Sequence, residues 1–133
     1  MKAVFADTSF FLASLNPDDA LHNKAIALSR EVAAPRLITG FVLLEVANAM
    51  SRAAQRSQFM EFYTQLKEHP HACIIPVSQK LFDRGYALYA SRKDKDWSLT
   101  DCISFIVMSD ADLSDALTHD RHFEQAGFAA LLK

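Results

Sequence analysis

Four carboxylates stand where acidic side chains are unusual, inside or directly beside apolar segments. Asp7 interrupts the apolar run "VFADTSFFLASL", and Glu45 lies among leucine and valine neighbours in "FVLLEVANAM". Asp101 opens the apolar segment "DCISFIVM", and Asp120 follows the short run "ALTH". A carboxylate in apolar surroundings must be hydrogen-bonded, protonated or held by a cation. These four residues are therefore the first candidates for a chemical site.

The segments around these acids alternate between short strand-like runs and helical spacing. Strands are expected near residues 4–6, 36–38, 73–76 and 116–118. Helices are expected over residues 20–32, 40–56, 58–68 and 79–92, from a cap at Ser98 or Thr100 to about residue 109, and over 122–125. Asp18 or Asp19, Thr39 and Ser78 are the expected caps of three of them. This alternation predicts an α/β fold, an α/β/α sandwich with a short, mostly parallel central sheet.

Three of the acids, Asp7, Asp101 and Asp120, fall just past a strand or at the start of the helix after one. The carboxyl ends of parallel strands meet at one edge of a sheet, so we expect these residues to converge there with Glu45. Grouped carboxylates repel one another, and a divalent cation removes the repulsion. Oxygen ligands without histidine or cysteine favour Mg²⁺ or Mn²⁺, and such a site suits phosphoryl transfer by a metal-activated water.

Each acid also has a purely structural interpretation. Asp7 could cap the following helix, Glu45 could lie on an exposed helix rim, Asp101 could interact with a helix dipole, and Asp120 could belong to a turn. Taken together, these interpretations require four independent coincidences, which favours one shared site. A phosphatase with Asp7 as nucleophile would want a second aspartate two residues later, and position 9 is serine.

Composition limits the class of protein. The 133 residues are 50% hydrophobic and 23% charged, with a net charge of −2, so we expect one domain without the broad basic surface of a sequence-blind nucleic-acid binder. Cys73 and Cys102 stand apart in apolar settings and are expected to be buried thiols rather than zinc ligands. No segment has the apolar length of a membrane span, and the expected location is the cytoplasm.

Four motifs, "FADTSFFLASL", "LLEVANAM", "WSLTDCISFIVM" and "ALTHDRHFEQAGF", carry a family resemblance over essentially the whole chain. The sequence resembles PIN-domain ribonucleases and, within them, the VapC toxins of bacterial toxin–antitoxin pairs. The resemblance implies that residues 1–133 form one PIN-like nuclease domain that cleaves RNA endonucleolytically with Mg²⁺ or Mn²⁺. It also implies that Asp7 and Asp101 are the main metal ligands and that Glu45 and Asp120 complete the site. The resemblance also suggests that hydroxyl groups orient a carboxylate or the attacking water, and the candidate residues are Thr8, Ser9 and Thr118.

The resemblance further implies a homodimer, an RNA substrate and a small antitoxin whose carboxyl-terminal segment blocks the acidic cleft, with no role for a membrane. Candidate RNA contacts are basic residues near the acids in sequence. Arg52 and Arg56 follow Glu45 on the same expected helix, and the others are Arg92, Lys93 and Lys95 before Asp96 and Arg121 after Asp120. Asp96 is either an outer acid of the site or a solvated loop charge, and Trp97 is expected to pack internally. The alternative function is a non-catalytic PIN-like module that binds RNA or a protein.

Overall fold

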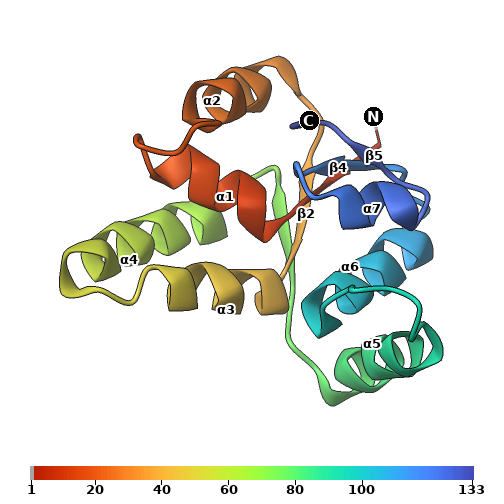
Figure 1. Ribbon diagram of the computed structural model, residues 1–133. Helices are drawn as coiled ribbons and strands as arrows, with labels where there is room; N and C mark the ends of the chain where they lie inside the picture. The colour runs from red at the N-terminus through yellow and green to blue at the C-terminus, as the bar shows by residue number, and fades with distance from the viewer. Residues whose placement is uncertain (1) are drawn as a thin grey trace.

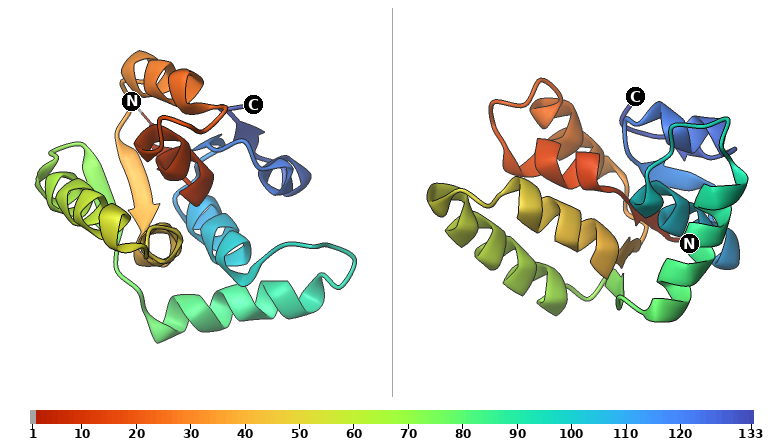
Figure 2. Two further views of the ribbon diagram at one scale, coloured as in Figure 1. Left: turned by 60° about the vertical axis from the view of Figure 1, so that its left-hand side comes forward. Right: turned by 60° about the horizontal axis from the view of Figure 1, so that its bottom comes forward.

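The computed structural model describes residues 2–133 and contains a five-stranded sheet with helices packed around it (Figure 1). The strands are β1 (Val4–Ala6), β2 (Arg36–Thr39), β3 (Ala72–Ile75), β4 (Asp115–Leu117) and β5 (Ala129–Ala130). The helices are α1 (Thr8–Leu15), α2 (His22–Glu31), α3 (Gly40–Ala49), α4 (Ala53–Glu68), α5 (Gln79–Ser91), α6 (Leu99–Asp110) and α7 (Arg121–Gln125). In Figure 1 and the right-hand view of Figure 2, α1 to α4 gather on one side of the molecule and α5 to α7 on the other.

The sheet has the order β3-β2-β1-β4-β5, and each described pair of neighbouring strands is parallel. The prediction of an α/β sandwich with a parallel sheet is confirmed. Strand β1 lies in the middle and is buried along its whole length, as expected of a central parallel strand with an unbroken apolar sequence. Its end lies beside the end of β4, because Ala6 pairs with Leu117 and the Asp7 N–H donates to the Leu117 carbonyl at 3.1 Å. This register puts Asp7 beside the residues that follow β4.

Helices α5 and α6 pack closely, and a glycine makes the contact possible. Gly85 is buried in α5, and a Cβ atom added to it would lie 2.3 Å from Cγ1 of Ile103 in α6. The loop that joins the two helices is anchored by Trp97, which is buried as predicted. Its indole Nε1–H donates to Gln125 Oε1 at 3.0 Å, and its ring meets the Phe105 ring edge-on. The loop is thereby fixed next to the first turn of α6.

The expected single helix over residues 40–56 is wrong, because α3 ends at Ala49 and α4 begins at Ala53. Side chains satisfy the backbone at this break: the Ser51 hydroxyl donates to the Asn48 carbonyl at 2.7 Å, and Arg56 Nε donates to the Ser51 carbonyl at 2.7 Å. The prediction that Arg52 and Arg56 share a helix with Glu45 is therefore also wrong.

Two smaller expectations fail as well. Helix α2 begins at His22 after Leu21, and Asp19 instead accepts a hydrogen bond from the Leu21 N–H in the preceding turn, so neither Asp18 nor Asp19 is the cap. Cys102 is buried as expected, but Cys73 is exposed because it lies on β3, an edge strand. None of the helices in residues 2–133 is long and apolar enough to cross a membrane.

Candidate functional site

All four predicted carboxylates line one cavity of about 330 Å³ at the carboxyl edge of the sheet. Asp7 follows β1, Glu45 comes from α3, Asp101 from the first turn of α6, and Asp120 immediately precedes α7. The remaining lining residues are Thr8, Ser9, Leu12, Asp96, Ser98 and His122. Segments from both ends of the chain thus meet at this cavity, as the parallel topology requires.

Asp7 is buried with 5% of its surface exposed, and its hydrogen bonds come from hydroxyl groups. Thr118 Oγ1 donates to Asp7 Oδ2 at 2.9 Å, and Ser9 Oγ lies 3.4 Å from the same oxygen. Asp7 occupies the N-cap position of α1, but its carboxylate makes no capping bond to the helix, so capping does not account for the side chain. Burial raises the pKa of Asp7 to about 7, against the lowering effect of the Thr118 hydrogen bond.

Thr118 holds this part of the site together. Its side chain is completely buried, and its oxygen accepts a hydrogen bond from the Asp120 N–H at 3.1 Å while its hydroxyl donates to Asp7. The Ser9 hydroxyl lies 3.1 Å from the same oxygen. Thr118 therefore fixes the Asp7 carboxylate relative to the backbone that carries Asp120.

Asp101 combines a structural role with a place in the cavity. It forms a capping box with Ser98: the Asp101 N–H donates to Ser98 Oγ at 3.0 Å, and the Ser98 N–H donates to Asp101 Oδ2 at 3.2 Å. The interpretation of Asp101 as a partner of the helix start is thus correct but incomplete. Burial raises the pKa of Asp101, the hydrogen bond with His122 lowers it, and the negative charge of Asp120 raises it.

The other two acids are half-buried and are also held by hydrogen bonds. The Thr8 hydroxyl donates to Glu45 Oε1 at 2.6 Å, which joins the start of α1 to α3. Asp120 Oδ1 accepts from the His122 N–H at 2.8 Å and caps α7. Each of the four predicted carboxylates is therefore oriented by at least one neighbour.

His122 is the residue of the cavity that sequence reasoning missed. Its Nδ1 lies 3.1 Å from Asp101 Oδ2 and 3.4 Å from Asp120 Oδ1. The three side chains offer ligand atoms that all lie within 4.8 Å of one another. The only sequence signal was the Asp-x-His spacing at the start of α7. The donor set therefore adds one imidazole nitrogen to the expected oxygens, whereas the sequence argument for Mg²⁺ or Mn²⁺ assumed a site without histidine.

None of the predicted basic residues lines the acidic cavity. Arg52 and Arg121 are exposed elsewhere, whereas Arg92, Lys93 and Lys95 line an adjoining cavity. Asp96 is exposed in the loop before α6 and does line the acidic cavity. The structure thus brings the acids and hydroxyls together but leaves the predicted cations outside.

Comparison with known proteins adds a family and several similar structures. Residues 4–129 match the model of the PIN domain family. VapC20 of Mycobacterium tuberculosis, described as a sarcin–ricin loop cleaving toxin, is 24% identical with a TM-score of 0.86, over 95% of this chain and 96% of that one. VapBC2 of Rickettsia felis, solved with a fragment of its promoter DNA, is 14% identical with a TM-score of 0.67, over 96% of each chain. A toxin–antitoxin complex of Klebsiella pneumoniae is 18% identical with a TM-score of 0.62, over 89% of this chain and 87% of that one. No curated protein matches the chain in sequence.

Proposed function

Because the chain belongs to the PIN domain family, we propose that it is a metal-dependent endoribonuclease, the toxin of a toxin–antitoxin pair. The similar structures include an RNA-cleaving toxin and toxin–antitoxin complexes, which supports this assignment. The reaction is the hydrolysis of an RNA phosphodiester bond at the cavity of Asp7, Glu45, Asp101 and Asp120, in the cytoplasm.

The observation that carries the proposal is the accumulation of carboxylates around one cavity with two of them buried. Burial raises the pKa of Asp7 to about 7 and also raises the pKa of Asp101, so a positive partner in the cavity would stabilise the ionised form of both carboxylates. No lysine or arginine is among the described residues that line the cavity. These carboxylates would hold Mg²⁺ or Mn²⁺, which would supply that charge and the chemistry of polarising a phosphate and activating a water.

The chain's own residues divide into ligands and orienting groups. Asp7 and Asp101 would be the main metal ligands, and Glu45, Asp120 and His122 would complete the site. The hydroxyls of Thr8, Ser9 and Thr118 hold these carboxylates in fixed orientations through the hydrogen bonds described above. Preorganisation of this kind lowers the reorganisation needed when charge develops on the phosphate.

The test is cleavage of total cellular RNA by the purified protein with Mg²⁺, with Mn²⁺ and with EDTA. Asp7→Asn and Asp101→Asn each remove one carboxylate with little change of shape, and Asp18→Asn is the matched control on an exposed turn. We expect metal-dependent cleavage by the wild type and the control and none by the two site variants. A folded wild type that cleaves nothing with either metal would refute the nuclease assignment and favour a non-catalytic binding module.

We also propose that a small antitoxin occupies the acidic cavity with its carboxyl-terminal segment. Such a segment would need a cation of its own to satisfy the carboxylates, and it would exclude RNA. Coexpression with the product of an adjacent gene tests the proposal. Growth inhibition by the wild-type chain should disappear when the two proteins are coexpressed. If growth is still inhibited and the two proteins form no stable complex, the antitoxin proposal is wrong.

A homodimer is the third part of the proposal, and exposed apolar side chains offer a surface for it. Phe82 and Tyr86 lie one turn apart on α5, with 41% and 56% of their surfaces exposed. Val77 and Leu44 are exposed on neighbouring segments, at 57% and 56%. Phe82→Glu should convert a sedimenting dimer to a monomer, and an unchanged sedimentation coefficient would exclude this surface.

A further inference from the structure

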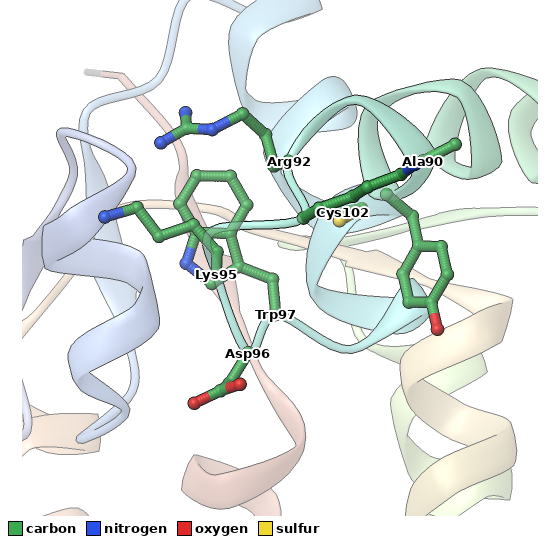
Figure 3. A pocket seen from close by; sticks show the side chains of 8 residues that line it. Ala90, Arg92, Lys95, Asp96, Trp97 and Cys102 are labelled. Atoms are coloured by element: carbon green, nitrogen blue, oxygen red, sulfur yellow. The ribbon is translucent and has the colours of Figure 1, made fainter.

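A second cavity, of about 490 Å³, lies beside the acidic one. Its wall consists of the last turns of α5, the loop over residues 92–97 and the start of α6 (Figure 3). Asp96 lines both cavities, so the two share a boundary. Figure 3 shows the Asp96 carboxylate pointing away from Arg92, on the other side of the loop. Because the two cavities share a boundary, a nucleic-acid strand with a phosphate in the acidic cavity would have a neighbouring nucleotide within reach of the second cavity.

The second cavity is lined by side chains of the types that commonly contact nucleic acids. Arg92, Lys93 and Lys95 line it together with the half-exposed ring of Tyr89. Arginine guanidinium groups and tyrosine rings are the surfaces on which unpaired bases stack, and lysine ammonium groups pair with phosphates. The acidic cavity, in contrast, holds carboxylates that repel phosphate. The cations missing from the first cavity are therefore supplied by the second.

The geometry of Arg92 is fixed before any ligand binds. Its guanidinium carbon lies 4.9 Å from the centre of the Trp97 ring, and its Nε donates to Asp94 Oδ1 at 3.0 Å. Trp97 is in turn locked by its hydrogen bond to Gln125. The Arg92 side chain nevertheless keeps 40% of its surface exposed. A planar cation held in place but still accessible is suited to stacking, because little conformational freedom remains to be lost.

We propose that the second cavity binds one unpaired nucleotide of the substrate strand, adjacent to the phosphate that is cleaved. The base lies against Tyr89 and the Arg92 guanidinium, and Lys95 contacts the adjoining phosphate. The volume is in the range of sites that bury small ligands, which suits one nucleotide. This inference rests on the proposed nuclease function and assigns the residues that hold the substrate beside the cleaved phosphate. The bound nucleotide is unpaired, because a base must leave its helix to enter the cavity.

The test measures RNA binding without cleavage. Fluorescein-labelled A₆ and U₆ oligoribonucleotides and a blunt RNA duplex are titrated with the protein in EDTA, and fluorescence anisotropy is followed. We expect the single strands to bind more tightly than the duplex. Tyr89→Ala should weaken single-strand binding about tenfold, the order expected for loss of one base stack, and Tyr89→Phe should restore it.

Lys95→Ala has a different signature. The loss of one phosphate contact should reduce the slope of log K against log salt by about 0.7 for a single strand. Arg30→Ala is the matched control, since Arg30 is exposed and does not line the cavity. We expect this control to bind RNA like the wild type. Circular dichroism confirms that each variant is folded.

The outcomes separate this inference from the proposed function. If the wild type cleaves RNA with Mn²⁺ but Tyr89→Ala and Lys95→Ala bind single strands as it does, the second cavity is not a nucleotide site and the nuclease assignment stands. If no RNA is cleaved but both variants lose binding, the nucleotide site stands and the nuclease assignment fails. Equal binding of duplex and single strands would overturn the restriction to unpaired nucleotides.

Discussion

Asp7→Asn should stabilise the metal-free protein, and the gain should grow with pH. Burial raises the pKa of Asp7 from 3.8 to about 7. A carboxyl whose pKa is higher in the folded state than in the unfolded chain binds its proton more tightly when folded, so its ionisation lowers the free energy of unfolding. The penalty is absent below pH 3.8, grows between pH 3.8 and 7, and is complete above pH 7. Three pH units at about 1.4 kcal/mol each give a full penalty of about 4 kcal/mol.

The change of this penalty between two pH values can be measured with less interference from other effects of the substitution. At pH 5.5 the folded protein still protonates Asp7 while the unfolded chain does not, which gives a penalty of about 2 kcal/mol; at pH 8 it is about 4 kcal/mol. The asparagine side chain does not ionise, and its amide contacts contribute the same free energy at both pH values. The stability difference between Asp7→Asn and wild type should therefore increase by about 2 kcal/mol from pH 5.5 to pH 8.

Urea unfolding in EDTA at the two pH values measures this difference, with Asp18→Asn as the exposed control. A difference that does not change with pH would refute the reasoning, because it would mean that the Asp7 carboxyl ionises equally in the folded and unfolded states. Mg²⁺ added at pH 8 should stabilise the wild type, since it binds only the folded protein, and should stabilise Asp7→Asn much less.

Three further substitutions test the supports of the site and of the fold. Thr118→Val removes the hydroxyl that donates to Asp7 while keeping its shape, and urea unfolding at pH 8 should show a loss of about 1–3 kcal/mol. His122→Gln should weaken Mn²⁺ binding about 10- to 100-fold by calorimetry, because the imidazole contacts two acids of the site; unchanged affinity would remove His122 from it. Gly85→Ala should destabilise the protein by about 1–3 kcal/mol despite alanine's better helix propensity, because the new methyl collides with Ile103; thermal unfolding measures the loss.

The fold was predictable because its strands are short apolar runs separated by helical periods. Val4–Ala6 was expected as a strand and is one, and the helix caps Thr39 and Ser78 were expected and are present. These features are local, since a hydroxyl cap or an apolar triplet is decided within a few residues. The break between α3 and α4 was not predictable in the same way. No glycine or proline marks it, and side-chain bonds from Ser51 and Arg56 hold it.

The position of the acids was predictable for a different reason. A parallel sheet brings the residues after its strands to one edge, so the rule that Asp7 and Asp120 meet needs only the order and direction of the strands. What the rule cannot supply is the side-chain partner of each acid. His122 reaches Asp101 across 21 positions in sequence, and that contact depends on how α7 packs against α6.

The contrast between the two cavities follows from the same distinction. The acidic cavity is built from strand ends, and topology alone assembles it. The second cavity is built by one loop, whose Arg92 lies over Trp97 because that ring is held by Phe105 and Gln125 from other elements. Trp97 was expected to pack internally, which is correct, and Arg92 was already a candidate RNA contact. The sequence could not show that the arginine lies over the tryptophan ring, because that contact depends on the path of the loop between them and on the residues of other elements that hold the ring.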